Sequence, residues 1–188
     1  MLLGEADSAI AELNTLADRI EAVQRDSLTA PYFSRDFLFY SIGMLQAKQG
    51  RVAEARVAYE KALLENLGMY MAHFRLSAAA VLTHDTALAL NELEMAKLIR
   101  PDDPWVLLYK GSLLRDVGQL DDAERELRAA LRINSDFALP HLILGLVADA
   151  RGDTAASRVE YTSYLARASR VARERDFALD RLAMLARR

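Results

Sequence analysis

The chain has 188 residues, of which 52% are hydrophobic and 27% charged, which suits one continuous repeat or globular domain rather than two independent ones. Its net charge of -3 gives no general attraction for nucleic acid or anionic membranes, since both require clustered positive charge. The chain has no cysteine, which excludes disulfides and thiolate metal sites and fits either the cytoplasm or the periplasm.

The first 35 residues are expected to form a separate N-terminal segment. Apolar residues recur there in alternating steps of three and four, which predicts an amphipathic helix over residues 6–23. They are Ala6, Ala9, Leu13, Leu16, Ile20 and Val23. Residues 24–34 break the spacing and are expected to be a linker or an insertion. The residues before Ala6 lack the basic start and apolar run of a signal peptide, so none is expected.

From residue 36 onward, four series of residues recur at a constant spacing of 34. They are Gly43, Ser77, Gly111 and Gly145; Gly50, His84, Gly118 and Gly152; Ala55, Ala89, Ala123 and Ser157; and Tyr59, Leu93, Leu127 and Tyr161. The small residues of the first and third series allow two helices to approach closely, and the large residues of the fourth fill the space between successive hairpins. The glycines of the second series permit a left-handed turn between helices, and His84 departs from that pattern.

These series predict four helix–turn–helix units at residues 36–69, 70–103, 104–137 and 138–170. Residues 171–188 follow them, with Phe177, Ala178, Leu182 and Leu185 on one side and arginines mostly on the other. This pattern predicts a C-terminal capping helix, because the last unit of a repeat array needs a polar outer face.

The arrangement of residues 36–170 resembles the tetratricopeptide repeat, a helix–turn–helix unit with an L-G pair and a later A-x3-F. Ile42-Gly43 and Leu144-Gly145 reproduce the pair, and Ala55-x3-Tyr59 approximates the later element. The tryptophan of the family is absent from its usual place, which holds Phe39, His73, Leu107 and His141. The resemblance implies an all-α fold, a right-handed α-solenoid of antiparallel helix hairpins, with a concave face built from the first helix of each unit.

The resemblance also implies which side chains line the concave groove. They are Phe37, Tyr40 and Met44 in the first unit, Met71, Phe74 and Arg75 in the second, Trp105, Leu108 and Tyr109 in the third, and Leu139, Leu142, Ile143 and Leu146 in the fourth. We expect Trp105 and Tyr109, one helical turn apart, to be the main anchors for a partner. The alternative for Trp105 is that it packs against the preceding repeat.

Residues 139–147 are apolar on every side, so the inner face of this helix needs a cover. Three covers remain open: an apolar or amphipathic segment of a partner protein, the N-terminal helix of the same chain, or a second copy of the chain. The partner segment is the preferred interpretation. The groove offers only Arg75 for gripping a terminal carboxylate, so that binding mode of the family is not expected.

No catalytic, metal or cofactor site is predicted. His73 and His141 occupy equivalent packing positions, no histidine pair has the i, i+4 spacing of a helical zinc site, and the chain has no phosphate-binding glycine loop. No stretch reaches the roughly 18 apolar residues needed to cross a bilayer, so a soluble protein without membrane insertion is expected. The sequence therefore predicts a non-enzymatic, chaperone-like scaffold or adaptor that binds a protein or peptide; the alternative is a structural unit that assembles into homo-oligomers.

Overall fold

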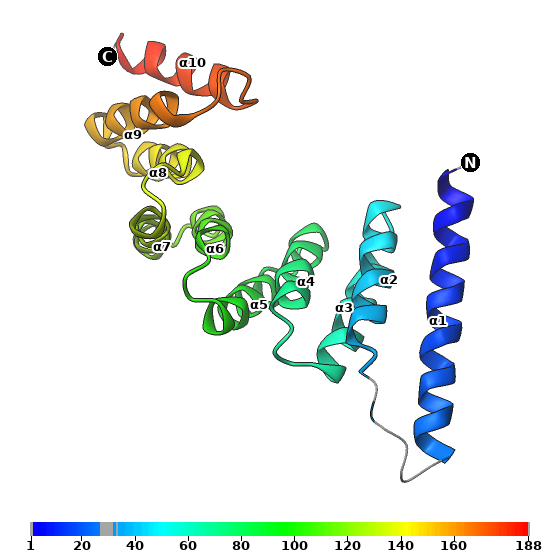
Figure 1. Ribbon diagram of the computed structural model, residues 1–188. Coiled ribbons are helices and arrows are strands. Elements are labelled where there is room, and N and C mark those ends of the chain that lie inside the picture. The colour runs from blue at the N-terminus through cyan, green and yellow to red at the C-terminus, as the bar shows by residue number, and fades with distance from the viewer. Residues whose placement is uncertain (1, 27–31, 33, 188) are drawn as a thin grey trace. The chain divides into compact units, whose positions relative to one another are not determined.

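The computed structural model describes residues 2–26, 32 and 34–187, and within them it contains ten α-helices and no strand (Figure 1). A long helix, α1 (Leu2–Asp26), precedes four hairpins. The hairpins are α2 (Asp36–Lys48) with α3 (Val52–Glu65), α4 (Tyr70–Leu82) with α5 (Thr86–Ile99), α6 (Pro104–Asp116) with α7 (Leu120–Ile133), and α8 (Ala138–Arg151) with α9 (Thr154–Arg167). The last helix is α10 (Arg175–Leu185). The predicted all-α solenoid of helix hairpins is confirmed.

The helices form two compact units, unit 1 from Met1 to Ile99 and unit 2 from Arg100 to Arg188. Unit 1 contains α1 to α5, and unit 2 contains α6 to α10. The composition indicated one continuous domain. A repeat packs mainly against its immediate neighbours, so compactness in such a chain is a local property of a few successive hairpins.

The turn inside each hairpin uses left-handed backbone at the position expected from the sequence. Gly50, Gly118 and Gly152 have φ angles of 77°, 79° and 74°, and His84 has a φ of 59°. Glycine adopts this conformation without steric cost, whereas a side chain with a Cβ does not. The hairpin α4–α5 therefore carries backbone strain at His84 that the other three hairpins avoid.

The helices of a hairpin approach most closely where a first helix has glycine. A Cβ added to Gly43 would lie 2.5 Å from Cε1 of Tyr59, and one added to Gly145 would lie 2.6 Å from Cε1 of Tyr161. In the third hairpin, a Cβ on Gly111 would lie 2.7 Å from Cγ of Leu127. These large residues thus lie directly over the glycines of their own hairpins, whereas the sequence predicted them between successive hairpins.

In unit 1, α1 packs against the first hairpin. Ile10 is buried in a cluster with Ile42 and Ala58, and Leu13 packs against the same cluster. Of the stripe predicted from the sequence, Leu16 and Val23 are exposed, whereas Ile10 and Ala17 are buried. The contact face of α1 therefore overlaps the predicted stripe at Ala6, Ala9, Leu13 and Ile20, which are partly buried, and departs from it where Ile10 and Ala17 are buried in place of Leu16 and Val23.

Ion pairs hold α1 near both of its ends. Arg35, which precedes α2, contacts Oε2 of Glu21 through one guanidinium nitrogen and Oε1 of Glu65 through the other, each at 2.6 Å. Near the other end, Arg51 contacts Asp7 at 2.9 Å. These contacts help to fix the direction in which α1 crosses the first hairpin and how closely α1 lies against it.

In unit 2, α10 packs against the last hairpin. Ala178 and Leu185 of α10 are buried in a cluster with Leu142, Tyr161 and Tyr164. A polar contact supports this packing, since Asp149 accepts hydrogen bonds from the hydroxyl of Tyr161 at 2.6 Å and from a guanidinium nitrogen of Arg181 at 2.7 Å. Burial raises the pKa of the Tyr161 hydroxyl, and its bond to the Asp149 carboxylate acts in the same direction. The phenol therefore remains a hydrogen-bond donor.

Candidate protein-binding groove

Six of the side chains predicted to line a groove are exposed. In unit 1 they are Phe37 and Met44 of α2 and Met71 and Arg75 of α4; in unit 2 they are Trp105 and Tyr109 of α6. Phe37 exposes 69% of its surface, and Trp105 and Tyr109 expose 46% and 48%. These positions are accessible to a partner.

Three other predicted groove residues are buried and cannot line a groove. Tyr40, Leu108 and Leu142 expose only 8%, 5% and 5% of their surface. Tyr40 belongs to a core cluster with Tyr59 of its own hairpin and Met69 at the start of the next. A position three residues beyond an exposed one is turned by about 300° around the helix axis, which directs it toward the neighbouring hairpin. Tyr40 thus stabilises the junction with the next hairpin, and Leu142 packs in a cluster with residues of α9 and α10.

The remaining predicted positions are half-buried: Phe74 in α4, and Leu139, Ile143 and Leu146 in α8. Leu139 packs against the cluster formed by α9 and α10, and Leu182 of α10 contacts the same cluster. The cover required by the apolar helix α8 is therefore supplied in part by the C-terminal helix. The N-terminal helix, one of the three covers that the sequence left open, packs against α2 and α3.

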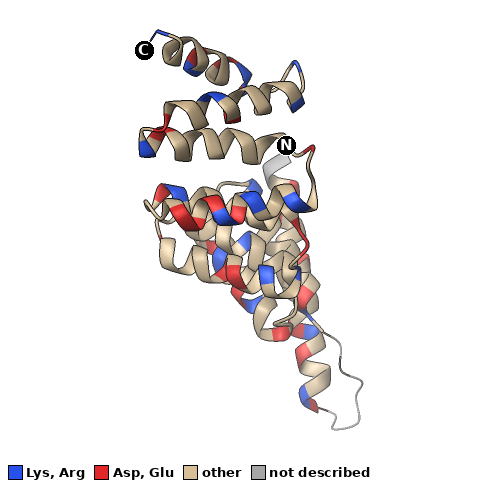
Figure 2. Cartoon of the chain, turned by 90° about the vertical axis from the view of Figure 1, so that its left-hand side faces the viewer, with Lys and Arg blue, Asp and Glu red and all other residues tan. Residues whose placement is uncertain are grey.

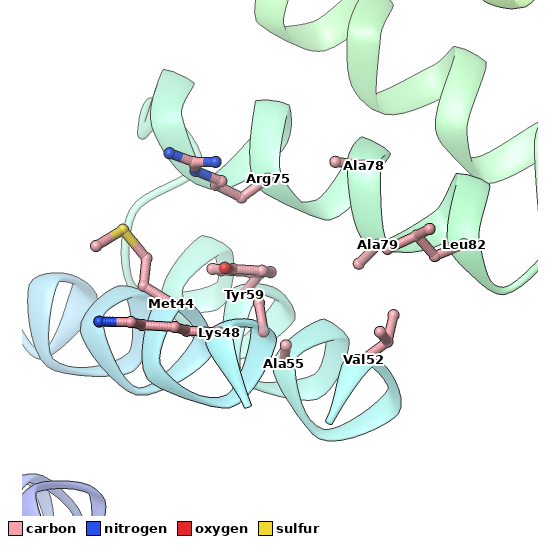
Figure 3. A pocket seen from close by; sticks show the side chains of 10 residues that line it. Met44, Lys48, Val52, Ala55, Tyr59, Arg75, Ala78, Ala79 and Leu82 are labelled. Carbon is pink, nitrogen blue, oxygen red and sulfur yellow. The ribbon is translucent and has the colours of Figure 1, made fainter. Parts of the chain in front are cut away.

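Unit 1 contains a groove of about 330 Å³ bordered by α2, α3 and α4 (Figure 3). Its lining consists of Met44, Ala47 and Lys48 from α2, Val52, Ala55 and Tyr59 from α3, and Arg75, Ala78, Ala79 and Leu82 from α4. Four of these residues are alanines, and their small side chains leave the space open. Position 78 is the clearest example, because the equivalent place holds methionine in α2 and leucine in α8.

The groove has a polar end and an apolar end. Figure 3 shows the side chains of Lys48, Tyr59 and Arg75 pointing in one direction, with Val52 and Leu82 at the other end. Burial raises the pKa of the Tyr59 hydroxyl, while the positive charge of Arg75 opposes that shift. The phenol stays protonated near neutral pH and can donate a hydrogen bond at the polar end.

The two cations of the groove lack ion-pair partners in the part of the chain that the structure describes. No carboxylate among residues 2–26, 32 and 34–187 forms an ion pair with Lys48 or Arg75. Acidic and basic segments alternate along the helices (Figure 2), but α4 contains no acidic residue, and the acidic residue of α2 is Asp36 at its start. Asp36 is occupied with Asn66, which donates a hydrogen bond to it at 2.7 Å.

Met44 and Arg75 were predicted from the sequence to line a groove, whereas most of the other residues that line it were not. Lys48 and Leu82 each follow an inward position, Met44 or Ala78, by one helical turn, so extending the inward face to the end of each first helix would have found them. Of the lining residues of α3, Ala55 was predicted as a close contact within the hairpin and Tyr59 as a residue that fills the space between successive hairpins. Both border the groove because the residues opposite them on α4 include two alanines.

In unit 2, the exposed aromatic residues of α6 form a cluster. The ring centroids of Trp105 and Tyr109 are 6.3 Å apart, and Trp105 meets the ring of Phe137 edge-on at 4.7 Å. Asp103 caps α6 by accepting a hydrogen bond from the backbone N–H of Trp105 at 2.8 Å. Local contacts therefore hold the indole in place while nearly half of its surface stays accessible.

The two histidines that recur in the repeat each contact a buried glutamate. Nδ1 of His73 lies 2.6 Å from the Glu92 carboxylate, and its Nε2 lies 2.9 Å from the carbonyl oxygen of Leu67. Both ring nitrogens thus face acceptors, which favours the doubly protonated imidazolium. Although burial lowers the pKa of His73, its hydrogen bonds to Glu92 and Leu67 together raise it above its ordinary value.

Glu92 belongs to a series of buried glutamates at the repeat spacing, followed by Glu126 and Glu160. Lys110 contacts Glu126 at 2.9 Å, and His141 contacts Glu160 at 2.7 Å. Burial raises the pKa of Glu160, and the hydrogen bond from His141 and the charge of Arg128 together hold it below its ordinary value. In each of these three hairpins, a side chain of the first helix thus contacts a buried carboxylate of the second, and Arg128 of the preceding hairpin also contacts Glu160 at 2.7 Å.

Among the residues that the structure describes, no three or more histidine or carboxylate side chains are grouped in a way that could hold a metal ion. None of the described helices combines the length and the apolar character needed to cross a membrane.

Comparison with known proteins identifies the fold. No family model matches the chain, and no curated protein matches it in sequence. Solved structures do match, and those of tetratricopeptide-repeat proteins are prominent among them. The chain therefore has the tetratricopeptide-repeat fold, as the resemblance implied.

Three of the similar structures illustrate the extent of the match. MamA is 16% identical with a TM-score of 0.74, over 87% of this chain and 83% of MamA. A tetratricopeptide-repeat protein from Parabacteroides merdae is 18% identical with a TM-score of 0.73, over 96% of this chain and 72% of the other. YrrB, described as a tetratricopeptide-repeat protein with an unusual peptide-binding site, is 19% identical with a TM-score of 0.72, over 95% of this chain and 88% of YrrB.

Proposed function

We propose that the chain is a protein-interaction scaffold whose groove in unit 1 binds an apolar or helical segment of a partner protein. The observation that carries this proposal is the open groove between α2, α3 and α4, which is lined mainly by alanine and larger apolar side chains. Peptide-binding sites are typically apolar concavities with a few polar groups that fix orientation. The peptide-binding site named for YrrB supports the same role on a similar fold.

The exposed aromatic cluster of unit 2 is the second contact surface in this proposal. Trp105 and Tyr109 are large, locally braced and accessible. Such residues often dominate binding energy, because they bury much surface while losing little conformational freedom. We propose that this cluster contributes to partner binding and that the chain has no catalytic role.

Filling the groove tests the proposal. We would select binders from a displayed library of random 12-residue peptides and measure their affinity for the wild-type chain and for Ala78→Phe. The added ring occupies the groove, so the affinity should fall at least about tenfold. Ala87→Phe is the matched control, because Ala87 is exposed on α5 and does not line the groove. Peptides that bind Ala78→Phe as well as wild type would contradict a binding role for the groove.

Self-assembly is the alternative to partner binding, and it predicts a different measurement. Sedimentation velocity over a concentration series reports whether the chain associates with itself. A monomer at tens of micromolar is the expected result for a scaffold. A concentration-dependent oligomer that Ala78→Phe disrupts would instead assign the groove to a second copy of the chain.

A further inference from the structure

We propose that the groove in unit 1 selects a partner segment in which an aspartate or glutamate side chain lies beside a large apolar side chain. The carboxylate contacts Lys48 and Arg75, and the apolar side chain occupies the end near Val52 and Leu82. This inference rests on the proposed function and specifies the chemistry of the partner.

Lys48 and Arg75 differ from the other cations of the first helices, which form ion pairs. Lys110 is paired with Glu126, Arg115 with Asp116, and Arg151 with Asp121 and Glu124. Within residues 2–26, 32 and 34–187, only the two first-helix cations that line the groove have no ion-pair partner. An open anion-binding position therefore coincides with the groove.

The carboxylates of the neighbouring helix α3 do not line this groove, and two of them have ion-pair partners. Glu65 is paired with Arg35, and Glu60 with Arg56. Glu54 borders a different hollow, beside Asn14 and Lys61. A carboxylate from a bound segment would therefore meet no like charge among the lining residues, and the phenol of Tyr59 lies at the same end of the groove.

The lining residues favour a side-chain carboxylate over the carboxylate of a chain terminus. Arginine can bind a carboxylate through two parallel hydrogen bonds, and lysine adds a mobile positive charge. The groove lining contains no asparagine or glutamine that could hold the backbone of a chain terminus. The carboxylate is therefore assigned to a side chain within the segment, and the apolar remainder of the lining accommodates its neighbour.

The opposite end of the groove sets the second requirement. Leu82 is largely exposed, and Val52, Ala78 and Ala79 surround the space beside it. Burying apolar surface there stabilises the complex by roughly 25 cal/mol per Å² removed from water. A segment with acidic residues alone would leave this end empty, and one with apolar residues alone would leave the two cations without a partner.

The test compares an acidic peptide with its neutral counterpart. From the display selection, the tightest binder that is sensitive to Ala78→Phe is synthesised with both ends blocked, once as selected and once with each Asp or Glu changed to Asn or Gln. Fluorescence polarisation should show at least about tenfold weaker binding of the neutral peptide. Affinity of the acidic peptide should also fall about fivefold between about 50 and about 500 mM NaCl.

Variants of the chain complete the test. Lys48→Gln with Arg75→Gln should reduce the affinity for the acidic peptide to that for the neutral one, and leave the neutral peptide unaffected. The control pair Arg132→Gln and Arg170→Gln makes the same change in net charge at exposed positions outside the groove and should have little effect. Circular dichroism and thermal unfolding verify that all variants are folded.

Each outcome decides between the two proposals. Equal binding of acidic and neutral peptides that remain sensitive to Ala78→Phe overturns the acidic preference and leaves the groove as a binding site. Preference for a free terminal carboxylate over a blocked peptide also overturns it. If no selected peptide responds to Ala78→Phe, the proposed function itself fails.

Discussion

In unit 1, the first helices α2 and α4 border an open groove with two cations that form no ion pair with any described residue, whereas in unit 2 the first helix α8 shares a buried cluster with α10, and its Arg151 is paired. The two units nevertheless have the same repeat spacing and the same hairpin geometry. The difference arises from neighbours: α1 packs against the first hairpin through Ile10, while α10 joins the buried cluster against which Leu139 of α8 packs. In this chain, the additional helix that packs against a hairpin determines which face of that hairpin remains accessible to a partner.

The largest expected effect removes the cover of unit 2. Ala178→Asp places a charge at a fully buried position of α10 that contacts Leu142 and Tyr161. Burying an unpaired charge is costly, so the docking of α10 should weaken by about 3 kcal/mol or more. Hydrogen exchange should accelerate in α8, α9 and α10 and remain unchanged in unit 1. Leu179→Asp, at an exposed position of the same helix, is the control. Unchanged protection in Ala178→Asp would show that α10 does not stabilise unit 2.

The next effect tests whether both units depend on the same close helix contact. Gly43→Ala and Gly145→Ala each insert a Cβ against a tyrosine ring and should destabilise the chain by about 1–3 kcal/mol. Chemical denaturation measures the change, and Gly4→Ala is the control, because a Cβ there meets no atom within 4 Å. Equal stability of Gly145→Ala and wild type would mean that the hairpin relaxes without cost.

A third prediction compares the two binding surfaces. If a selected peptide reaches the aromatic cluster of unit 2 as well as the groove of unit 1, Trp105→Ala should weaken it by about tenfold. The partner test is a fluorescence titration of the peptide against wild type, Trp105→Ala and Ala78→Phe. A peptide sensitive to Ala78→Phe alone would confine binding to unit 1 and remove Trp105 as an anchor.

The periodicity of the sequence was sufficient to predict the hairpins, their turns and their glycine contacts. Each depends on one residue and its position within a helix, as with Gly118 in a left-handed turn. The surface was harder to predict. Phe37 and Trp105 are exposed as expected. Tyr40 is buried, because residues of the following hairpin pack against it.

The charges of the groove could not have been predicted from the repeat. Lys48 and Arg75 are notable because they form no ion pair with any residue that the structure describes, and pairing depends on side chains brought together from separate helices. Lys110 is a comparable cation in the sequence, but it meets Glu126. The partial covering of α8 likewise required knowing that α10 packs against α9 and completes the buried cluster that contains Leu142 of α8.

A smaller effect concerns the strained turn. His84→Gly should stabilise unit 1 by about 0.5–1 kcal/mol, because glycine adopts a positive φ without steric cost. Thermal unfolding measures the gain. The reverse change in unit 2, Gly118→Ala, should destabilise the chain by about 1 kcal/mol. A loss of stability in His84→Gly would indicate that the imidazole makes a compensating interaction.

The smallest expected effect is the dependence of unit 1 on pH. The pKa of His73 is raised in the folded chain, so its contribution is complete below its ordinary pKa of 6.5 and is lost as the pH rises through the folded value. The loss is limited, because neutral His73 can still donate a hydrogen bond to Glu92. Denaturation at pH 6 and pH 8.5 should show lower stability at the higher pH. The double variant His73→Leu with Glu92→Leu should lack that difference, and an equal difference would assign it to another group.

The buried glutamates at positions 92, 126 and 160 have a consequence for how such an array can change in length. Each contacts a side chain on the first helix of its own hairpin, which is His73, Lys110 or His141. Glu160 also contacts Arg128 of the preceding hairpin, at 2.7 Å. Deleting the hairpin α6–α7 would therefore remove an ion-pair partner of Glu160, so a whole hairpin is not an electrically independent unit at this position.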